Sequence, residues 1–284
     1  MADHMPGVRD ADDRFVRLDD GDIHVVQDGR RGAPALLLIH GLGASTAWWD
    51  PVVPQLASAC RVIRVDLPGH GRSAIPAGGY DIPAHARRIG AALDRLGAGR
   101  VAVIGHSTGG TVATALAEQR PDKLTAVALI GIGPSPDADL GQGLLSRLLL
   151  ARVPGRLLWA LRTEATIRKA LRSAFTRPVD IPDAIIEATR GMTHQALAGT
   201  ARGSLDYLRQ RSLPDRLAAL GLPVLVLFGT DDRRWRSSSA AAYCAVPGAR
   251  VELLPGVGHT PMLEDPQATG KLLLEFAAIA AHPN

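Results

Sequence analysis

The chain of 284 residues has little cysteine, few aromatic side chains and no long apolar run. Its two cysteines, Cys60 and Cys244, are too few for a disulfide framework and lack the spacing of metal ligands, so we expect ordinary thiols and no metal site. The longest apolar run, near 220–229, contains Gly221 and Pro223 and is shorter than the roughly 18 residues that span a bilayer. The sequence therefore predicts no membrane span.

An export signal and a nucleic-acid motif are also missing. The N-terminal segment is polar and acidic, without a basic stretch followed by an apolar one, so we expect a cytoplasmic protein. Only 4% of the residues are aromatic and no recognised nucleic-acid motif is present, so the net charge of +4 does not indicate a nucleic-acid partner.

The positive charge is concentrated in one part of the chain. Residues 134–216 carry thirteen Lys or Arg and eight Asp or Glu, a net charge of +5, whereas the remainder carries −1. The simpler interpretation is that these arginines form the solvated faces of amphipathic helices. A carboxylate-bearing substrate or an acidic carrier protein as partner is the alternative.

Strand-like and helix-like patterns alternate on both sides of this basic segment. Continuous apolar runs such as ALLLI (35–39), VAVI (101–104) and VLVLF (224–228) are typical of strands buried on both faces. Helical patterns lie between them, including 45–58 and 266–281, which predicts a mostly parallel eight-stranded sheet with helices on both faces. Residues 134–214 show only helical patterns. We therefore expect an α/β core domain at 1–133 and 215–284 and a helical cap domain at 134–214.

The segment VAVIGHSTGGTV (101–112) places one serine between two glycines where a strand gives way to a helix. A Gly-x-Ser-x-Gly turn in that context holds the serine hydroxyl exposed at the end of a sheet. Ser107 is therefore the candidate nucleophile.

A serine hydroxyl needs a general base, which a carboxylate orients. Of nine histidines, His259 follows the last predicted strand and so lies at the same edge of the sheet as Ser107. His40 and His70 lie in loops at that edge, and we interpret them as groups that hydrogen-bond the backbone. Asp231 and Asp232 directly follow the strand at 224–229, and either can face His259.

Acyl transfer also needs donors for the negative charge that develops on the carbonyl oxygen. The backbone N–H of Thr108, which follows the nucleophile, is one candidate. The second is the N–H of Leu42 in HGLG (40–43), a glycine-containing loop after the strand at 35–39.

Taken together, HGLG (40–43), DLPGHGRS (66–73), GHSTGG (105–110) and GTDD with PGVGHTPMLEDP (229–266) resemble the α/β-hydrolase superfamily, in its lidded esterase-like branch. The resemblance extends from about Phe15 to Ala281. It implies that Asp232, three residues after Gly229, is the acid. It also implies that loop 66–73 is structural and that the helical insert is a mobile cap.

The same resemblance narrows the chemistry. Haloalkane dehalogenases and epoxide hydrolases carry Asp at the position of Ser107, so acyl chemistry is favoured. Carbon–carbon bond hydrolases keep a serine but usually carry Asn before it and Trp after the histidine, where this chain has His106 and Thr260.

We therefore expect a serine hydrolase that cleaves an ester, lactone or thioester of a small to medium apolar substrate, without metal or cofactor. Trp159 and Phe175 of the insert are candidate substrate-binding residues, although both can simply pack the insert onto the sheet. Three alternatives stay open: a carbon–carbon bond hydrolase, an acyltransferase or perhydrolase, and a binding protein without turnover. The sequence does not define the oligomeric state.

Overall fold

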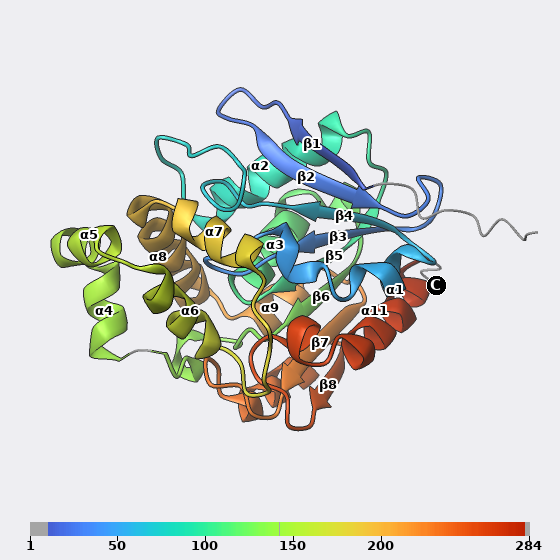
Figure 1. The fold of residues 1–284 in the computed structure, drawn as a ribbon. Coiled ribbons are helices and arrows are strands. Elements are labelled where there is room, and N and C mark those ends of the chain that lie inside the picture. The colour runs from blue at the N-terminus through green and yellow to red at the C-terminus, as the bar shows by residue number, and fades with distance from the viewer. Residues whose placement is uncertain (1–10, 142, 282–284) are drawn as a thin grey trace, which may run out of the picture.

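The computed structural model describes residues 11–141 and 143–281, which are built around one eight-stranded sheet (Figure 1). Its strands are β1 (Asp12–Val16), β2 (Ile23–Asp28), β3 (Ala35–Ile39), β4 (Arg61–Val65), β5 (Val101–His106), β6 (Leu124–Ile130), β7 (Val224–Gly229) and β8 (Arg250–Leu254). Their order across the sheet is β1-β2-β4-β3-β5-β6-β7-β8. The pairs β1–β2 and β2–β4 are antiparallel and the others parallel, which confirms the expected fold class.

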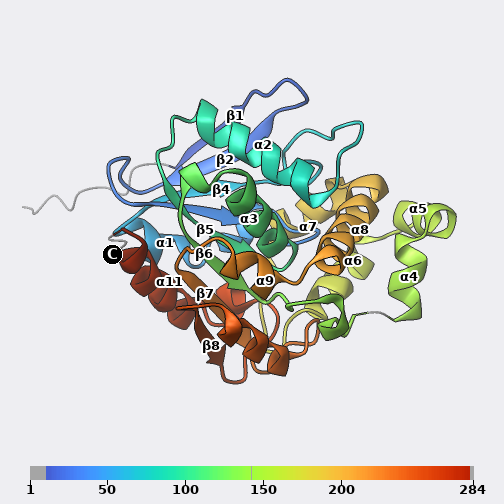
Figure 2. The same ribbon diagram turned by 180° about the vertical axis from the view of Figure 1, so that it is seen from behind.

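Helices connect the strands and cover both faces of the sheet (Figures 1 and 2). The α-helices are α1 (Val53–Ala57), α2 (Ile82–Arg95), α3 (Thr108–Gln119), α4 (Leu144–Leu150), α5 (Arg152–Ala160), α6 (Glu164–Arg172), α7 (Asp183–Gly191), α8 (His194–Gln210), α9 (Leu213–Ala218), α10 (Pro261–Glu264) and α11 (Pro266–Ala281). The 3-10 helices are η1 (Thr46–Trp49), η2 (Pro121–Lys123), η3 (Pro136–Ala138) and η4 (Ser237–Ala245).

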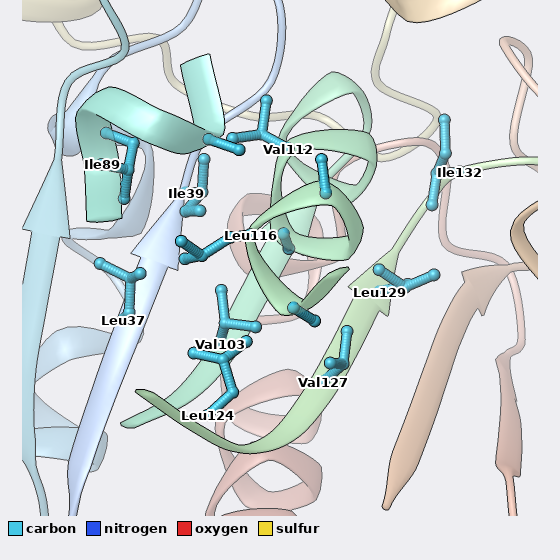
Figure 3. Close-up of a cluster of buried hydrophobic side chains, with 14 of the residues drawn as sticks. Leu37, Ile39, Ile89, Val103, Val112, Leu116, Leu124, Val127, Leu129 and Ile132 are labelled. Carbon is cyan, nitrogen blue, oxygen red and sulfur yellow. The ribbon is translucent and has the colours of Figure 1, made fainter. Parts of the chain in front are cut away.

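Alternate residues of each central strand contribute to two separate cores. On one face, side chains such as Leu37 and Val103 pack against α2 and α3, as Figure 3 shows for Ile89 and Leu116. On the other face, their strand neighbours pack against α1 and α11, with Leu56 among the buried contacts. Because successive side chains of a strand point to opposite faces, a strand covered on both sides must be apolar throughout, as these runs are.

One expected helix is wrong in detail. Residues 45–58 form the 3-10 helix η1 and the short helix α1 rather than one continuous helix. Pro51 and Pro54 lie in this stretch, and a proline inside a helix removes a backbone donor and clashes with the preceding turn. The chain therefore breaks between Trp49 and Val53.

Helices α4–α8 lie between β6 and β7 in the sequence and together at one side of the sheet in both views (Figures 1 and 2). The described residues of 134–214 contain no strand. The division into a core and a cap domain stays a prediction. Within 11–141 and 143–281, no helix combines the length and the hydropathy needed to cross a membrane.

Candidate active site

Ser107 follows β5 at a sharp turn into α3. Its φ of 52° lies in the left-handed region, the only such value among the described residues other than glycine. The glycines on either side are required by close backbone contacts. A Cβ on Gly105 would lie 2.3 Å from the carbonyl oxygen of Gly109, and one on Gly109 would lie 2.3 Å from that of Ile39. The motif therefore folds as a strand–turn–helix elbow with a half-buried serine at its apex.

The loop after β8 brings His259 to this serine. His259 Nε2 lies 3.1 Å from Ser107 Oγ, and His259 Nδ1 lies 2.9 Å from Asp232 Oδ2. The carboxylate accepts from Nδ1–H, which leaves the Nε2 lone pair facing the serine hydroxyl. An imidazole placed in this way can take the hydroxyl proton while the carboxylate balances its charge.

Asp232 lies in the loop that follows β7, and its side chain is buried. Its Oδ1 accepts hydrogen bonds from the backbone N–H groups of Arg234 and Trp235, at 2.7 and 3.0 Å. Burial raises the pKa of Asp232, but the imidazole of His259 and these two N–H groups outweigh it and hold the pKa below its ordinary value. Asp231, by contrast, is exposed and its side chain accepts from Thr230 Oγ1. The structure thus brings Asp232, and not Asp231, to His259.

The HGLG loop runs alongside the serine. A Cβ on Gly41 would lie 3.1 Å from Ser107 Cβ. The N–H groups of Leu42 and Thr108 have no acceptor within the described part of the chain. His40 is completely buried, donates from Nδ1 to the carbonyl oxygen of Gly41 at 2.7 Å and accepts at Nε2 from the N–H of Leu67 at 3.0 Å.

His106, next to the candidate nucleophile, points away from it. Its Nε2–H donates to the carbonyl oxygen of His259 at 3.0 Å, and its ring stacks on Trp48. Burial, together with the nearby charge of His259, lowers the pKa of His106 to about 3. The side chain is therefore neutral and holds the His259 loop through this hydrogen bond.

The two candidate substrate-binding residues lie in different places. Phe175 is buried, with its ring 6.0 Å from that of Trp48. Trp159 lies earlier in the insert, donates from Nε1 to the carbonyl oxygen of Met192 at 2.8 Å and belongs to the apolar cluster that also includes Leu42. Both side chains pack the insert onto the core. For each of them, a contact with substrate stays a prediction.

Glu264 is a site residue that the sequence analysis missed. Its buried carboxylate accepts hydrogen bonds from the N–H groups of Thr176 and Arg177 in the insert and of Gly258 and Thr260 on either side of His259, at 2.8–3.1 Å. One side chain therefore fixes the His259 loop to the insert. Its only sequence signal was a glutamate five residues after the histidine.

Loop 66–73 is held by the buried carboxylate of Asp66, which accepts from the N–H groups of Thr46 and Arg72 and pairs with His24 Nδ1 at 2.7 Å. These contacts join the loop to β2 and η1, and none of them reaches Ser107. Within the described part of the chain, no three His, Cys, Asp or Glu side chains are grouped to hold a metal ion.

Comparison with known proteins supports the fold class. The α/β hydrolase fold family matches residues 34–266. An uncharacterized protein of Mycobacterium tuberculosis is 30% identical over 250 residues, covering 82% of this chain and 72% of its own. The pimeloyl-[acyl-carrier protein] methyl ester esterase of Edwardsiella ictaluri is 28% identical, covering 89% and 96%.

A solved structure gives the same result for the fold. The crystal structure of a hydrolase from Pseudomonas aeruginosa has a TM-score of 0.76 at 24% identity, covering 93% of this chain and 98% of its own. With the family match across most of its length and the observed strand order, the chain belongs to the α/β-hydrolase superfamily.

Proposed function

We propose that this protein is a serine hydrolase that cleaves a carboxylic ester, lactone or thioester through an acyl-enzyme on Ser107. The observation that carries the proposal is the hydrogen-bonded chain from Ser107 Oγ through His259 to Asp232, with distances of 3.1 and 2.9 Å. Such a chain activates a hydroxyl that is otherwise a poor nucleophile at neutral pH.

In the proposed reaction, His259 takes the proton of Ser107 as Oγ attacks the substrate carbonyl. The negative charge that develops on the carbonyl oxygen is stabilised by the N–H groups of Leu42 and Thr108, which have no other acceptor among the described residues. His259 then protonates the leaving group, which departs and leaves the acyl group on Ser107. His259 next takes a proton from a water molecule that attacks the acyl group, and it returns the proton to Ser107 as the acid is released. Asp232 orients His259 and stabilises its charged form.

The surroundings of the site favour an apolar substrate. Trp48 stacks on His106 next to Ser107 and contacts Phe175, in a cluster with Ala44 and four isoleucines of the insert. The side chain of Leu42 packs on a second apolar cluster, which contains Met192. The relative from Edwardsiella ictaluri is named as an esterase of a methyl ester, which supports an ester as substrate here.

Hydrolysis of p-nitrophenyl esters from acetyl to dodecanoyl, with wild type and Ser107→Ala measured side by side, tests the proposal. We expect turnover that disappears in the variant, with a chain-length optimum that measures the acyl site. Labelling by a fluorophosphonate gives a second readout, because it reports an activated serine whatever the natural substrate is.

The outcomes separate the alternatives. Labelling at Ser107 without turnover of any ester would favour a carbon–carbon bond hydrolase or a narrow substrate range. A change of product on adding an alcohol or peroxide would favour an acyltransferase or perhydrolase. The absence of both labelling and turnover would contradict the proposal and would favour a binding protein.

A further inference from the structure

Helices α4 and α5 expose an unusual number of apolar side chains. Of eleven large hydrophobic residues that are exposed in the described part of the chain, seven lie between Leu140 and Leu161. Figures 1 and 2 both show these two helices at the outer end of the inserted helices, beyond α8. Burial in the core therefore does not explain these side chains.

The apolar side chains of α5 form one stripe. At about 100° per residue, positions 153, 157 and 161 lie on the same side of a helix. Val153, Leu157 and Leu161 are 79%, 63% and 69% exposed. The opposite side packs on α4 and α8, since a Cβ on Gly155 would lie 2.1 Å from the carbonyl oxygen of Leu149 and 2.5 Å from His194 Nε2. Helix α5 is thus held by one face and presents an apolar stripe on the other.

Helix α4 repeats this arrangement on a smaller scale. Leu144 and Leu148, one turn apart, are 74% and 40% exposed. In both helices an exposed arginine follows the first apolar residue by three positions, Arg147 in α4 and Arg156 in α5. Each apolar pair therefore has a cationic side chain beside it.

The charge of this segment has one sign only. Residues 140–163 contain four arginines and no Asp or Glu. Arg147, Arg152 and Arg156 are exposed and form no ion pair with any described carboxylate. Elsewhere in the insert arginines do find acidic partners, as Arg168 does with Glu164.

We propose that the exposed face of α4 and α5 binds the surface of an anionic lipid bilayer. Aliphatic side chains on a basic amphipathic helix enter the boundary between headgroups and acyl chains, while arginines bind the phosphates. A second copy of the chain is disfavoured, because a two-fold contact would bring the arginines of both copies into one interface without any carboxylate from this segment. An acidic protein surface would neutralise the arginines, but its carboxylates would not bury the exposed apolar stripe of α5.

Flotation of the full-length protein with vesicles tests this proposal without using its activity. We expect binding to vesicles of phosphatidylcholine mixed with phosphatidylglycerol and little binding to phosphatidylcholine alone. Because the arginines act through screened charge, binding to the mixed vesicles weakens as salt is raised.

Two sets of substitutions locate the contact. Arg147→Gln, Arg152→Gln and Arg156→Gln together are expected to lower the vesicle affinity on the order of a hundredfold. Val153→Ser with Leu157→Ser is expected to lower it about tenfold or more, because the two stripe residues lose their apolar burial in the bilayer. The first set keeps the test valid if the second impairs folding.

The control variants replace exposed residues of the same types elsewhere on the protein. Leu253→Ser with Ile279→Ser replaces side chains that are 49% and 51% exposed. Arg17→Gln, Arg87→Gln and Arg233→Gln removes the same amount of charge from exposed positions. Both control proteins are expected to bind vesicles as wild type does.

Several results would overturn the proposal. One is that the wild-type protein floats with neither vesicle composition, whether or not an acidic protein binds to α4 and α5. Another is that the control sets lose as much affinity as the test sets. A third is a dimer on size exclusion that the α5 serine variant dissociates, because the face would then be covered by a second copy.

Discussion

The imidazole of His40 donates its Nδ1–H to the carbonyl oxygen of Gly41, 2.7 Å away. This carbonyl and the N–H of Leu42 belong to one planar trans peptide group, so they point in opposite directions. The N–H of Leu67 occupies His40 Nε2, which fixes the tautomer. Burial lowers the pKa of His40 and keeps the ring neutral. His40 thereby sets the direction of the Leu42 N–H.

His40→Gln is therefore expected to lower kcat by about tenfold to a hundredfold with little change in KM, because the proposed oxyanion donor is misplaced. Steady-state kinetics on the best p-nitrophenyl ester measure this effect. His70→Gln is the matched control, since the His70 ring is buried 5.4 Å from that of His40 and hydrogen-bonds the carbonyl oxygen of Pro68. Equal losses in the two variants would show that the effect is general disruption of the loops.

The adjacent aspartates at the end of β7 give a matched pair of variants. Asp232→Asn is expected to lower kcat by on the order of 10⁴-fold, because an amide no longer holds His259 in the required tautomer. Asp231→Asn changes an exposed side chain and is expected to leave kcat close to wild type. Both are measured under the same conditions. The reverse ranking would exchange their roles.

Glu264 offers a test of the connection between insert and His259 loop. Glu264→Gln replaces one acceptor oxygen by a donor that faces a backbone N–H, and we expect it to destabilise the fold by about 1–3 kcal/mol. Urea unfolding measures that loss, and ester kinetics measure the accompanying fall in kcat. Glu252→Gln, at a partly exposed ion pair with Arg250, is the control and should change neither quantity noticeably. An unchanged free energy of unfolding in Glu264→Gln would contradict the role given to this carboxylate.

Local sequence patterns predict most of the fold and the positions of the candidate site residues. An apolar run in a doubly covered strand, or a serine between two glycines at a strand end, is determined by nearby residues. Parallel strands then bring their carboxyl ends to one edge, which is why Ser107, Asp232 and His259 meet although far apart in sequence.

Other features depend on tertiary contacts. The carboxylate of Glu264 accepts hydrogen bonds from the N–H groups of Thr176 and Gly258. No local sequence pattern indicates that this glutamate points inward to bind them. Likewise, both aspartates after β7 fit the strand-end pattern. Which of them is buried depends on how Trp235 packs and where its N–H points.

The backbone at Ser107 predicts a difference between two inactive variants. A side chain at φ 52° is strained, whereas glycine adopts this region readily. Ser107→Gly is therefore expected to be more stable than Ser107→Ala by about 1 kcal/mol, although glycine also gains freedom in the unfolded chain. Urea unfolding of the two variants gives the comparison. A more stable alanine variant would mean that the surrounding structure does not strain this residue.

Buried, neutral histidines predict how stability depends on pH. His85 is completely buried, with its Nε2 3.0 Å from Thr200 Oγ1, and burial together with the charge of Arg88 lowers its pKa to about 3. In the unfolded chain a histidine takes up a proton below about pH 6.5. Between these two values the unfolded state binds more protons, so the free energy of unfolding rises with pH by up to about 1.4 kcal/mol per unit for this residue.

His85→Gln is accordingly expected to reduce the slope of unfolding free energy against pH, by roughly 1.4 kcal/mol per unit between about pH 4 and pH 6. Urea unfolding at a series of pH values measures this slope. Thr200→Val separates titration from hydrogen bonding, because it removes the partner of His85 and leaves the imidazole in place. That variant should lose stability at every pH with an unchanged slope. A His85→Gln slope equal to that of wild type would show that His85 takes up its proton equally in the folded and unfolded states.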